Sequence, residues 1–221
     1  MALGGSNVRA LILVAHADDE TLGAGGLMQK LRGAHWDVRV VIMSDGVVRT
    51  RTEVCDNRQG ARNACAILDV PEPLFLGFAD QKFDTVAVAD LANAVLALAI
   101  EPDLICTHTD TDLNRDHRMT AEVARIVGRP RKKPVAIVGC EIPNTSFWNG
   151  TPFMPNYYVD ITTELDKKIA AFSCYGNEMR AFPDPWSSEG LRLLAAYHGM
   201  QAGYRAAEAY VVVRAGEGLL L

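Results

Sequence analysis

Residues 11–20 read LILVAHADDE, an apolar run that ends in one histidine and three acids. The run Leu11–Val14 is short and apolar, which is typical of a buried strand. Asp18, Asp19 and Glu20 would repel one another at the end of that strand, and burying them would cost desolvation energy. A bound cation would remove this cost. The stretch therefore predicts a strand that ends at a metal site.

A second polar cluster follows another short apolar run, Leu104–Cys106. Residues 108–117 read HTDTDLNRDH and combine two histidines with three aspartates. The two clusters lie far apart in the sequence, yet each comes directly after a predicted strand. Their common chemistry and common position indicate one metal site that is built from distant parts of the chain.

The ligands that this site needs can be chosen from the two clusters. His16 and Asp19 are three residues apart on a loop that enters a predicted helix, so both side chains can reach one point. His117 would complete a set of two imidazoles and one carboxylate. Three protein ligands and an open fourth position are typical of catalytic zinc, so we expect Zn²⁺. The same set can hold non-haem Fe²⁺. Asp18 is then left beside the metal as a candidate general base.

The acidic run also has a purely structural interpretation. Acidic residues in the first turn of a helix complement the helix dipole and can cap the helix. One such motif alone would not exclude this interpretation. The second His/Asp cluster, in a matching position after a strand, favours the metal site.

Strand-like and helix-like segments alternate along the chain. Strands separated by helices of ordinary length predict βαβ units and a parallel sheet. We expect a Rossmann-like, doubly wound α/β fold with a mostly parallel sheet, the core strand order 3-2-1-4-5, and one domain over residues 1–221. In such sheets, sites form beyond the carboxyl ends of strands where the connections diverge. This strand order would bring the loops of His16 and His117 together.

The expected elements follow from hydrophobic spacing and turn residues. The strands are 9–15, 37–43, 73–78, 103–107, 135–140, 157–161 and 210–213. The helices are 21–32, 54–68, 85–100, 117–127, 162–175 and 187–208. We expect the last helix to be interrupted at Gly199 or Gly203, and residues 144–156 to form a loop near the site.

Composition excludes some classes of function. The net charge is −5, and a nucleic-acid binder usually shows a basic excess. The one basic run, 129–133, is more typical of a solvated loop. Five scattered cysteines without a C-x-x-C pair indicate reduced thiols in a cytoplasmic protein. We expect no signal peptide and no transmembrane segment, because no apolar stretch approaches the roughly 20 residues that a bilayer requires. A homo-oligomer remains open.

The two motifs together resemble those of the LmbE-like (PIG-L) family of metal-dependent N-deacetylases. That family carries A-H-P-D-D-E before a Gly-Gly pair, and a later D-x-N-x-D-H or H-P-D-H. This chain has AHADDE at 15–20, then Gly25-Gly26, then DLNRDH at 112–117. Weaker echoes in the same order extend the resemblance from about residue 9 to about residue 213. They are Ser44-Asp45-Gly46, Phe75-Leu76-Gly77 with Asp80, Tyr157 to Ile161 with Lys167-Lys168, and Ala207 to Tyr210.

The resemblance implies a function and assigns residues to it. His16, Asp19 and His117 would bind the metal and Asp18 would be the base, which are the residues that chemistry alone selects. The implied reaction removes an acetyl group from the nitrogen of a small amino-sugar derivative. The sugar could be free, carried on a nucleotide, or part of a glycoconjugate precursor. Asp18 would take a proton from a water activated by the metal and hand it to the leaving amine.

The chain departs from the family pattern at two positions. Ala17 replaces the usual proline, which would fix the backbone φ angle, but no ligand is lost. Asn114 stands where some members carry a histidine that stabilises the oxyanion, and Asn114 can still donate a hydrogen bond. His108 could supply an imidazole instead, or could simply be bonded to backbone at the strand end.

Substrate contacts are predicted with less support. Arg58 and Asp80 resemble family positions that contact sugar hydroxyls, although Arg58 could belong to an exposed helix face. Arg49 and Arg51 could bind a phosphate carrier, although a solvated loop is favoured. Four aromatic residues could stack on a sugar ring, although packing in a core or lid is favoured for each. They are Trp148, Phe153, Tyr157 and Trp186.

Two other functions compete with deacetylation. A hydrolase of a phosphoester or of a thiol-conjugate amide could use Asp110, Asp112 and Asp116, since phosphoesterases often bridge two metals with carboxylates. A non-catalytic nucleotide-binding domain could use residues 23–26 as a phosphate cradle. That run lacks the G-x-G-x-x-G spacing and lies inside a predicted helix, so close helix–strand packing explains its glycines better.

Overall fold

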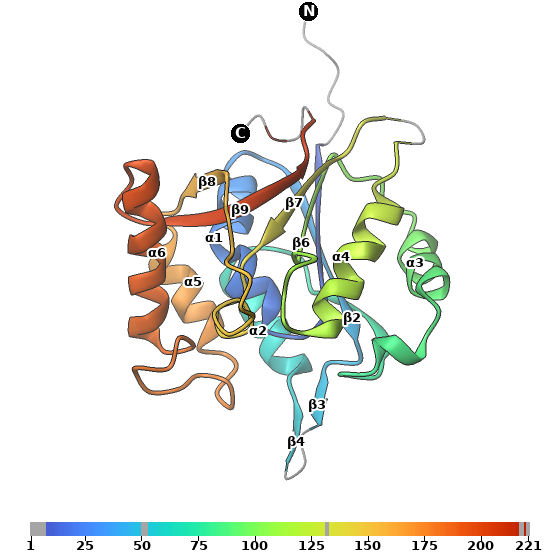
Figure 1. The fold of residues 1–221 in the computed structure, drawn as a ribbon, viewed down its shortest axis with the longest axis horizontal. Helices are drawn as coiled ribbons and strands as arrows, with labels where there is room; N and C mark the ends of the chain where they lie inside the picture. Colours follow the sequence, from blue (N-terminus) through green and yellow to red (C-terminus); the bar gives the residue numbers. More distant parts are fainter. Residues whose placement is uncertain (1–7, 50–52, 131–132, 217–218, 220–221) are drawn as a thin grey trace, which may run out of the picture.

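The computed structural model describes residues 8–49, 53–130, 133–216 and 219 (Figure 1). Arg51 and residues 131–132 of the basic run lie outside the described residues. Within the described part of the chain, a seven-stranded sheet forms the centre of the molecule. Its strands, in spatial order, are β5 (Leu74–Phe78), β2 (Asp37–Ser44), β1 (Arg9–Val14), β6 (Leu104–Thr107), β7 (Ala136–Cys140), β9 (Ala207–Arg214) and β8 (Tyr157–Asp160).

The strand order confirms the predicted topology. The run β5-β2-β1-β6-β7 is parallel throughout and corresponds to the order 3-2-1-4-5. β9 pairs antiparallel with β7, and β8 pairs antiparallel with β9, so the sheet is mixed at one edge. β1 lies between β2 and β6, which places the loop after β1 next to the loop after β6. These are the loops that carry the two polar clusters.

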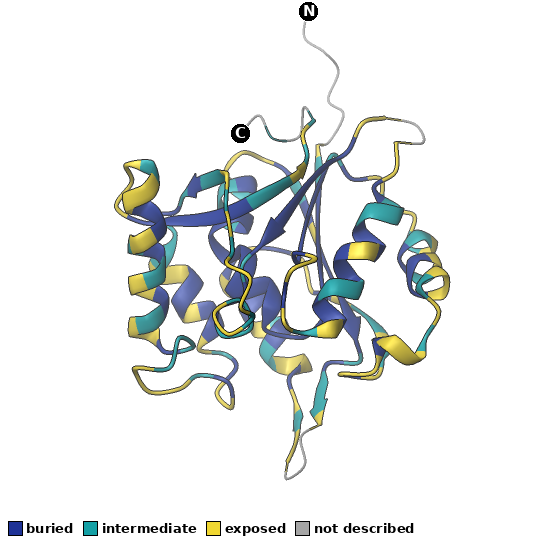
Figure 2. Cartoon of the chain, viewed as in Figure 1, coloured by how far each residue is buried: buried dark blue, intermediate teal, exposed yellow. Residues whose placement is uncertain are grey.

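Helices cover both faces of the sheet, as a doubly wound fold requires. One face packs against α1 (Asp19–Gly33), α2 (Arg58–Ile67), α5 (Leu165–Phe172) and α6 (Ser188–Ala202), and the other against α3 (Val88–Ala97) and α4 (Arg115–Val127). Alternate residues of β1 enter the two cores, and Ala10–Val14 is fully buried. Figure 2 shows the central strands buried and the outer helix faces exposed. Burial on both faces explains the unbroken apolar run at 11–14.

Two predicted helices are wrong in part. Residues 54–56 begin no helix but form β4 (Val54–Asp56), which pairs with β3 (Val47–Arg49) in an antiparallel hairpin. Valine and cysteine are weak helix formers, and the pairing with β3 outweighs their helical spacing. The helix expected over 187–208 ends at Ala202, so the predicted interruption at Gly203 is confirmed, but no helix follows it in residues 203–208, all of which the structure describes. Gly203 has the left-handed φ of +80° that stops a helix, and the following residues start β9 early.

The glycines of α1 serve packing, as predicted. α1 bends at Ala24, whose φ of −146° is not helical. A Cβ at Gly23 would overlap the Cys140 side chain, and one at Gly26 would overlap Ile161. In the bend, the backbone N–H of Gly26 donates to Glu208 Oε1 over 2.8 Å. The run 23–26 therefore lies buried inside a helix and offers no phosphate cradle.

Gly26→Ala is expected to destabilise the fold by about 1–3 kcal/mol, because the new methyl group must displace packed neighbours. Urea unfolding of the variant measures this change in the free energy of unfolding. Gly33→Ala is the matched control, since a Cβ at Gly33 meets nothing within 4 Å. Equal unfolding midpoints for the two variants would contradict the packing account.

No helix in the described part of the chain is long and apolar enough to cross a membrane.

Candidate metal centre

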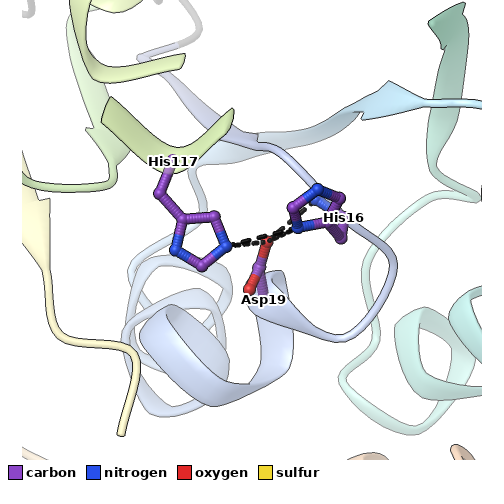
Figure 3. A group of neighbouring side chains, drawn as sticks. All are labelled: His16, Asp19 and His117. Atoms are coloured by element: carbon purple, nitrogen blue, oxygen red, sulfur yellow. Dashed lines mark hydrogen bonds and ion pairs between the residues drawn. The ribbon is translucent and has the colours of Figure 1, made fainter. Parts of the chain in front are cut away.

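Three side chains meet beyond the carboxyl end of β1 (Figure 3). His16 follows β1, Asp19 is the first residue of α1, and His117 lies in the first turn of α4. His16 Nδ1 is 3.3 Å from His117 Nε2 and 3.4 Å from Asp19 Oδ2. His117 Nε2 is 3.4 Å from the same Asp19 oxygen. The structure thus brings together the three residues that the sequence selected as ligands.

The spacing of these atoms fits a metal ion. Bonds of 2.0–2.1 Å at tetrahedral angles hold ligand atoms about 3.3–3.4 Å apart, which is the spacing observed here. All three side chains are buried. The donor set and its geometry therefore suit Zn²⁺, and the donor types also permit Fe²⁺.

The second ring nitrogen of each histidine, which is not part of the ligand triangle, lies close to carboxylate oxygens. Asp112 Oδ2 is 3.1 Å from His117 Nδ1. Asp116 Oδ2 and Asp80 Oδ1 are each 3.2 Å from His16 Nε2. Carboxylates in such positions fix the orientation and tautomer of metal-binding histidines. Sequence reasoning offered Asp112 and Asp116 as bridges between two metals, but their contacts with the imidazoles support one metal.

The charges of the cluster also fit a cation. Burial lowers the pKa of His117, but the carboxylates of Asp19 and Asp112 outweigh burial and raise that pKa to about 9. Burial raises the pKa of Asp19, but the imidazoles of His117 and His108 outweigh burial and hold that pKa well below its usual range. The carboxylates of the cluster therefore favour positive charge at this point, as a metal site requires.

Asp18 is held beside the three ligands by its backbone. Its φ of +140° is strained for a residue with a side chain. The backbone N–H of Asp18 donates to Glu20 Oε2 over 3.1 Å, and its carbonyl accepts from Thr21 and Leu22 at 3.0 Å each. Burial raises the pKa of Asp18 well above its usual value, and the charge of Asp19 raises it further. A raised pKa suits a group that takes and returns a proton near neutral pH.

Glu20, the last acid of the run, supports Asp18. It is fully buried and accepts hydrogen bonds from the hydroxyl groups of Tyr175 and Thr21 as well as from the Asp18 backbone. The sequence gives no sign of this role, because Tyr175 is distant in the chain. Glu20 is thus a positioning residue rather than a ligand.

A pocket of about 200 Å³ opens over the cluster, and we call it the metal pocket. Its wall consists of His16, Asp18, Asp19, Val48, Arg49, Asp80, Gln81, Asn114, His117, Thr145, Glu178 and Trp186. Asp80 and Asn114, two of the predicted substrate contacts, belong to this wall. So do Glu178 and Gln81, to which sequence reasoning assigned no role.

The other two predicted substrate contacts lie outside the metal pocket. His108 is buried, accepts a hydrogen bond from the Ala15 N–H over 2.9 Å, and stacks on the His117 ring at 3.9 Å. Of the two roles that the sequence allowed for His108, the structure therefore shows the one bonded to backbone at the strand end. Arg58 is half-exposed and pairs with Asp56 over 2.6 Å.

Asn114 also has a structural function at the start of α4. Its Oδ1 accepts from the backbone N–H of Asp116 over 2.9 Å and of His117 over 3.4 Å, so it caps α4. Asparagine is a preferred N-cap residue. The cap fixes the first turn of α4, which presents His117, and leaves the Asn114 amide N–H₂ as a donor.

Asp112→Asn is expected to weaken zinc binding by about 10–100-fold, because the amide no longer fixes His117 as a carboxylate does. Competition with a chelator measures this affinity. Asp110→Asn is the control, since Asp110 is exposed and pairs only with Arg125 within the described residues. An unchanged affinity for zinc in the Asp112→Asn variant would show that Asp112 does not support the metal centre.

The chain is similar in sequence to one known protein family. The family model described as GlcNAc-PI de-N-acetylase (PIG-L) matches residues 11–127, which include all four central residues of the site. The uncharacterized deacetylase YaiS of Escherichia coli K12 is 29% identical over 76% of this chain and 92% of its own length. The diacetylchitobiose deacetylase of Thermococcus kodakarensis is 25% identical over 90% of this chain and 81% of its own.

A solved structure shares the fold. The N,N'-diacetylchitobiose deacetylase from Pyrococcus horikoshii, complexed with its inhibitor MPG, superposes with a TM-score of 0.73 at 22% identity, over 93% of this chain and 83% of that one. Fold and site together define a doubly wound α/β protein with a buried His–Asp–His centre at the carboxyl ends of its strands. The chain belongs to the PIG-L (LmbE-like) family, as the sequence resemblance implied.

Proposed function

We propose that this chain is a zinc-dependent N-deacetylase, and that residues 1–221 form one deacetylase domain. Its substrate is an N-acetylated amino-sugar derivative. One observation carries the proposal: the carboxylate of Asp18 shares a single pocket with the triangle of His16, Asp19 and His117. The relatives, which are deacetylases by name, support the reaction class.

The residues of the pocket suffice for amide hydrolysis. A zinc ion held by the triangle supplies Lewis acidity, which makes water a stronger acid and an amide carbonyl a better electrophile. Asp18 takes a proton from water as the water oxygen bonds to the acetyl carbonyl carbon. Asp18 then gives that proton to the amide nitrogen as the C–N bond breaks. The products are acetate and the free amino sugar.

The charge of the metal pocket favours a neutral sugar over a phosphorylated one. Its wall carries four carboxylates, of which Asp80 and Glu178 do not belong to the ligand triangle or the base. The one arginine in the wall, Arg49, is bound by both oxygens of Asp45 at 3.1 and 2.6 Å. The carboxylates of the wall would repel a phosphate group, and Arg49 could not offset this repulsion because it is already paired with Asp45.

The cellular setting is also part of the proposal. All five cysteines, which lie in the described part of the chain, are unpaired. Free thiols persist in a reducing compartment, which supports a cytoplasmic protein.

Acetate release tests the proposed reaction. The zinc-loaded protein is incubated with a panel of N-acetylated sugars and sugar nucleotides, and acetate and free amine are measured. Equal amounts of the two products are expected from at least one neutral sugar. A zinc-loaded, folded protein that releases acetate from no member of the panel would refute the proposal, and phosphate release from a phosphoester would favour the alternative.

A further inference from the structure

The bend in α1 separates the turn that carries part of the metal site from the rest of the helix. Asp19 is the first residue of α1, and the backbone leaves helical geometry at Ala24. Asp18 is bound to the same turn, since its carbonyl accepts from the N–H of Leu22 over 3.0 Å. The proposed base and one proposed ligand therefore lie on a single turn before the bend. We call this turn, residues 18–23, the ligand turn.

A carboxylate caps the part of α1 that follows the bend. In a straight α-helix, the N–H groups of residues 26 and 27 would donate to the carbonyls of residues 22 and 23. Here the N–H of Gly26 donates to Glu208 Oε1 over 2.8 Å, and the N–H of Leu27 donates to Glu208 Oε2 over 2.7 Å. The helix dipole favours a negative charge at this end of a helical segment. Glu208 therefore fixes the start of the second segment.

Two donors cap the ligand turn on the other side of the bend. Lys168 Nζ donates to the carbonyl of Leu22 over 2.7 Å and to Glu208 Oε1 over 2.6 Å. The Tyr210 hydroxyl lies 3.2 Å from the carbonyl oxygen of Gly23 and 2.7 Å from Glu208 Oε2, and it can donate to either. Lys168 belongs to α5, whereas the other two side chains belong to β9, and both elements pack against α1 (Figure 1). We call Lys168, Glu208 and Tyr210 the bend clamp.

The bend clamp is buried, although it contains two charged groups. Lys168 and Glu208 are 7% and 5% exposed, and Tyr210 is fully buried. Removing an ammonium group and a carboxylate from water costs much of what their attraction returns, so apolar side chains of similar volume often stabilise a fold as well. Apolar side chains could not, however, bond to N–H groups and carbonyls on both sides of a bend. The chemistry of the clamp therefore matches the geometry of α1.

The metal centre depends on the position of the ligand turn. Asp19 Oδ2 lies 3.4 Å from His16 Nδ1 and 3.4 Å from His117 Nε2. His117 is held by α4, so a shift of the ligand turn would move Asp19 relative to an imidazole that does not follow it. A displacement of about 0.5 Å is enough to take a ligand out of its productive geometry.

We propose that the bend clamp positions the ligand turn, and with it the ligand Asp19 and the base Asp18. None of the three clamp residues lines the metal pocket, so they act through the backbone of α1 and not on the substrate. This inference rests on the proposed deacetylase function and adds to it three positioning residues.

Metal affinity tests the bend clamp. Lys168→Met and Glu208→Gln are each expected to weaken zinc binding about tenfold in competition with a chelator, the loss that is usual for supporting residues outside the ligand set. The visible absorption of the cobalt-loaded variants should shift, because it reports the geometry of the ligands. At saturating zinc, kcat should fall while KM stays near the wild-type value, because the clamp does not contact the substrate.

Val95→Ala is the matched control for a loss of stability. Val95 is buried in α3, on the face of the sheet opposite α1. Its truncation should lower the urea midpoint of unfolding but leave the zinc affinity and the cobalt spectrum unchanged. The double variant Lys168→Met/Glu208→Gln removes both buried charges at once. It should bind zinc no more tightly than the single variants, because both caps are lost.

Two results would overturn the inference. Folded clamp variants with wild-type zinc affinity and an unchanged cobalt spectrum would show that the clamp only stabilises the fold. Recovery of wild-type affinity in the double variant would show that the single variants act through an unpaired buried charge. If no charge variant folds, Tyr210→Phe, which removes one hydroxyl, is measured in the same way. Weaker zinc binding then supports the clamp, and unchanged binding overturns it.

Failure of the proposed function would look different. A wild-type protein that binds zinc but releases no acetate refutes the deacetylase, whereas the zinc affinities still decide the role of the bend clamp. If the wild type binds neither zinc nor cobalt, amide hydrogen exchange in residues 18–23 decides it. Faster exchange in the double variant than in Val95→Ala supports the clamp, and equal exchange overturns it.

Discussion

Asp18→Asn is expected to lower kcat by about 10²–10⁴-fold, the range that a general acid–base group contributes, while zinc content stays at the wild-type level. The amide is nearly the same size as the carboxylate but cannot take a proton from water. Asp18 lies outside the ligand triangle, so its loss should not release the metal. The measurements are acetate release under saturating substrate and elemental analysis of the same sample.

Two outcomes would contradict the role of Asp18. Near-normal turnover in Asp18→Asn would show that another group accepts the proton. Loss of zinc would show that Asp18 is a ligand rather than the base. Asp69→Asn is the control, since Asp69 is an exposed aspartate at the end of α2 that also has a positive φ. It should retain full activity.

His117→Ala is expected to abolish zinc binding and activity together. It removes one of three ligands, and two protein ligands rarely retain zinc against dilution and buffer. The zinc content should fall from near one to below about 0.1 ion per chain after gel filtration. Elemental analysis gives the content, and circular dichroism shows whether the chain remains folded.

A matched variant on the same helix turn separates metal loss from damage to α4. Arg115→Ala removes an exposed side chain that lies 3.6 Å from Asp84 and faces no ligand. It should keep both zinc and activity. If a folded His117→Ala protein still binds one zinc ion, His117 is not a ligand.

The fold and the central residues could be predicted because their signals are local. Buried parallel strands leave short apolar runs, and the run at 11–14 is one of them. The polar residues that follow such strands must lie at one edge of the sheet. The expected strand order makes β1 and β6 neighbours, and it therefore predicts that His16 and His117 lie close together.

The supporting residues could not be predicted, because their partners are distant and follow no period. Nothing near Glu20 indicates that Tyr175 donates to it. Asp80 contacts His16 only because the loop after β5 lies beside the loop after β1. The hollow beside α6 could not be predicted either, since Trp148 and Tyr197 line it together only after α6 has packed on the sheet. The hairpin β3–β4 was missed because its strands are too short to show alternation.

Anomalous diffraction at the zinc absorption edge, from crystals of the zinc-loaded protein, tests most directly whether His16, Asp19 and His117 bind one metal ion. We expect one strong peak about 2.0–2.1 Å from His16 Nδ1, Asp19 Oδ2 and His117 Nε2. A peak elsewhere in the molecule, or none among these three atoms in a protein that releases acetate, would contradict it.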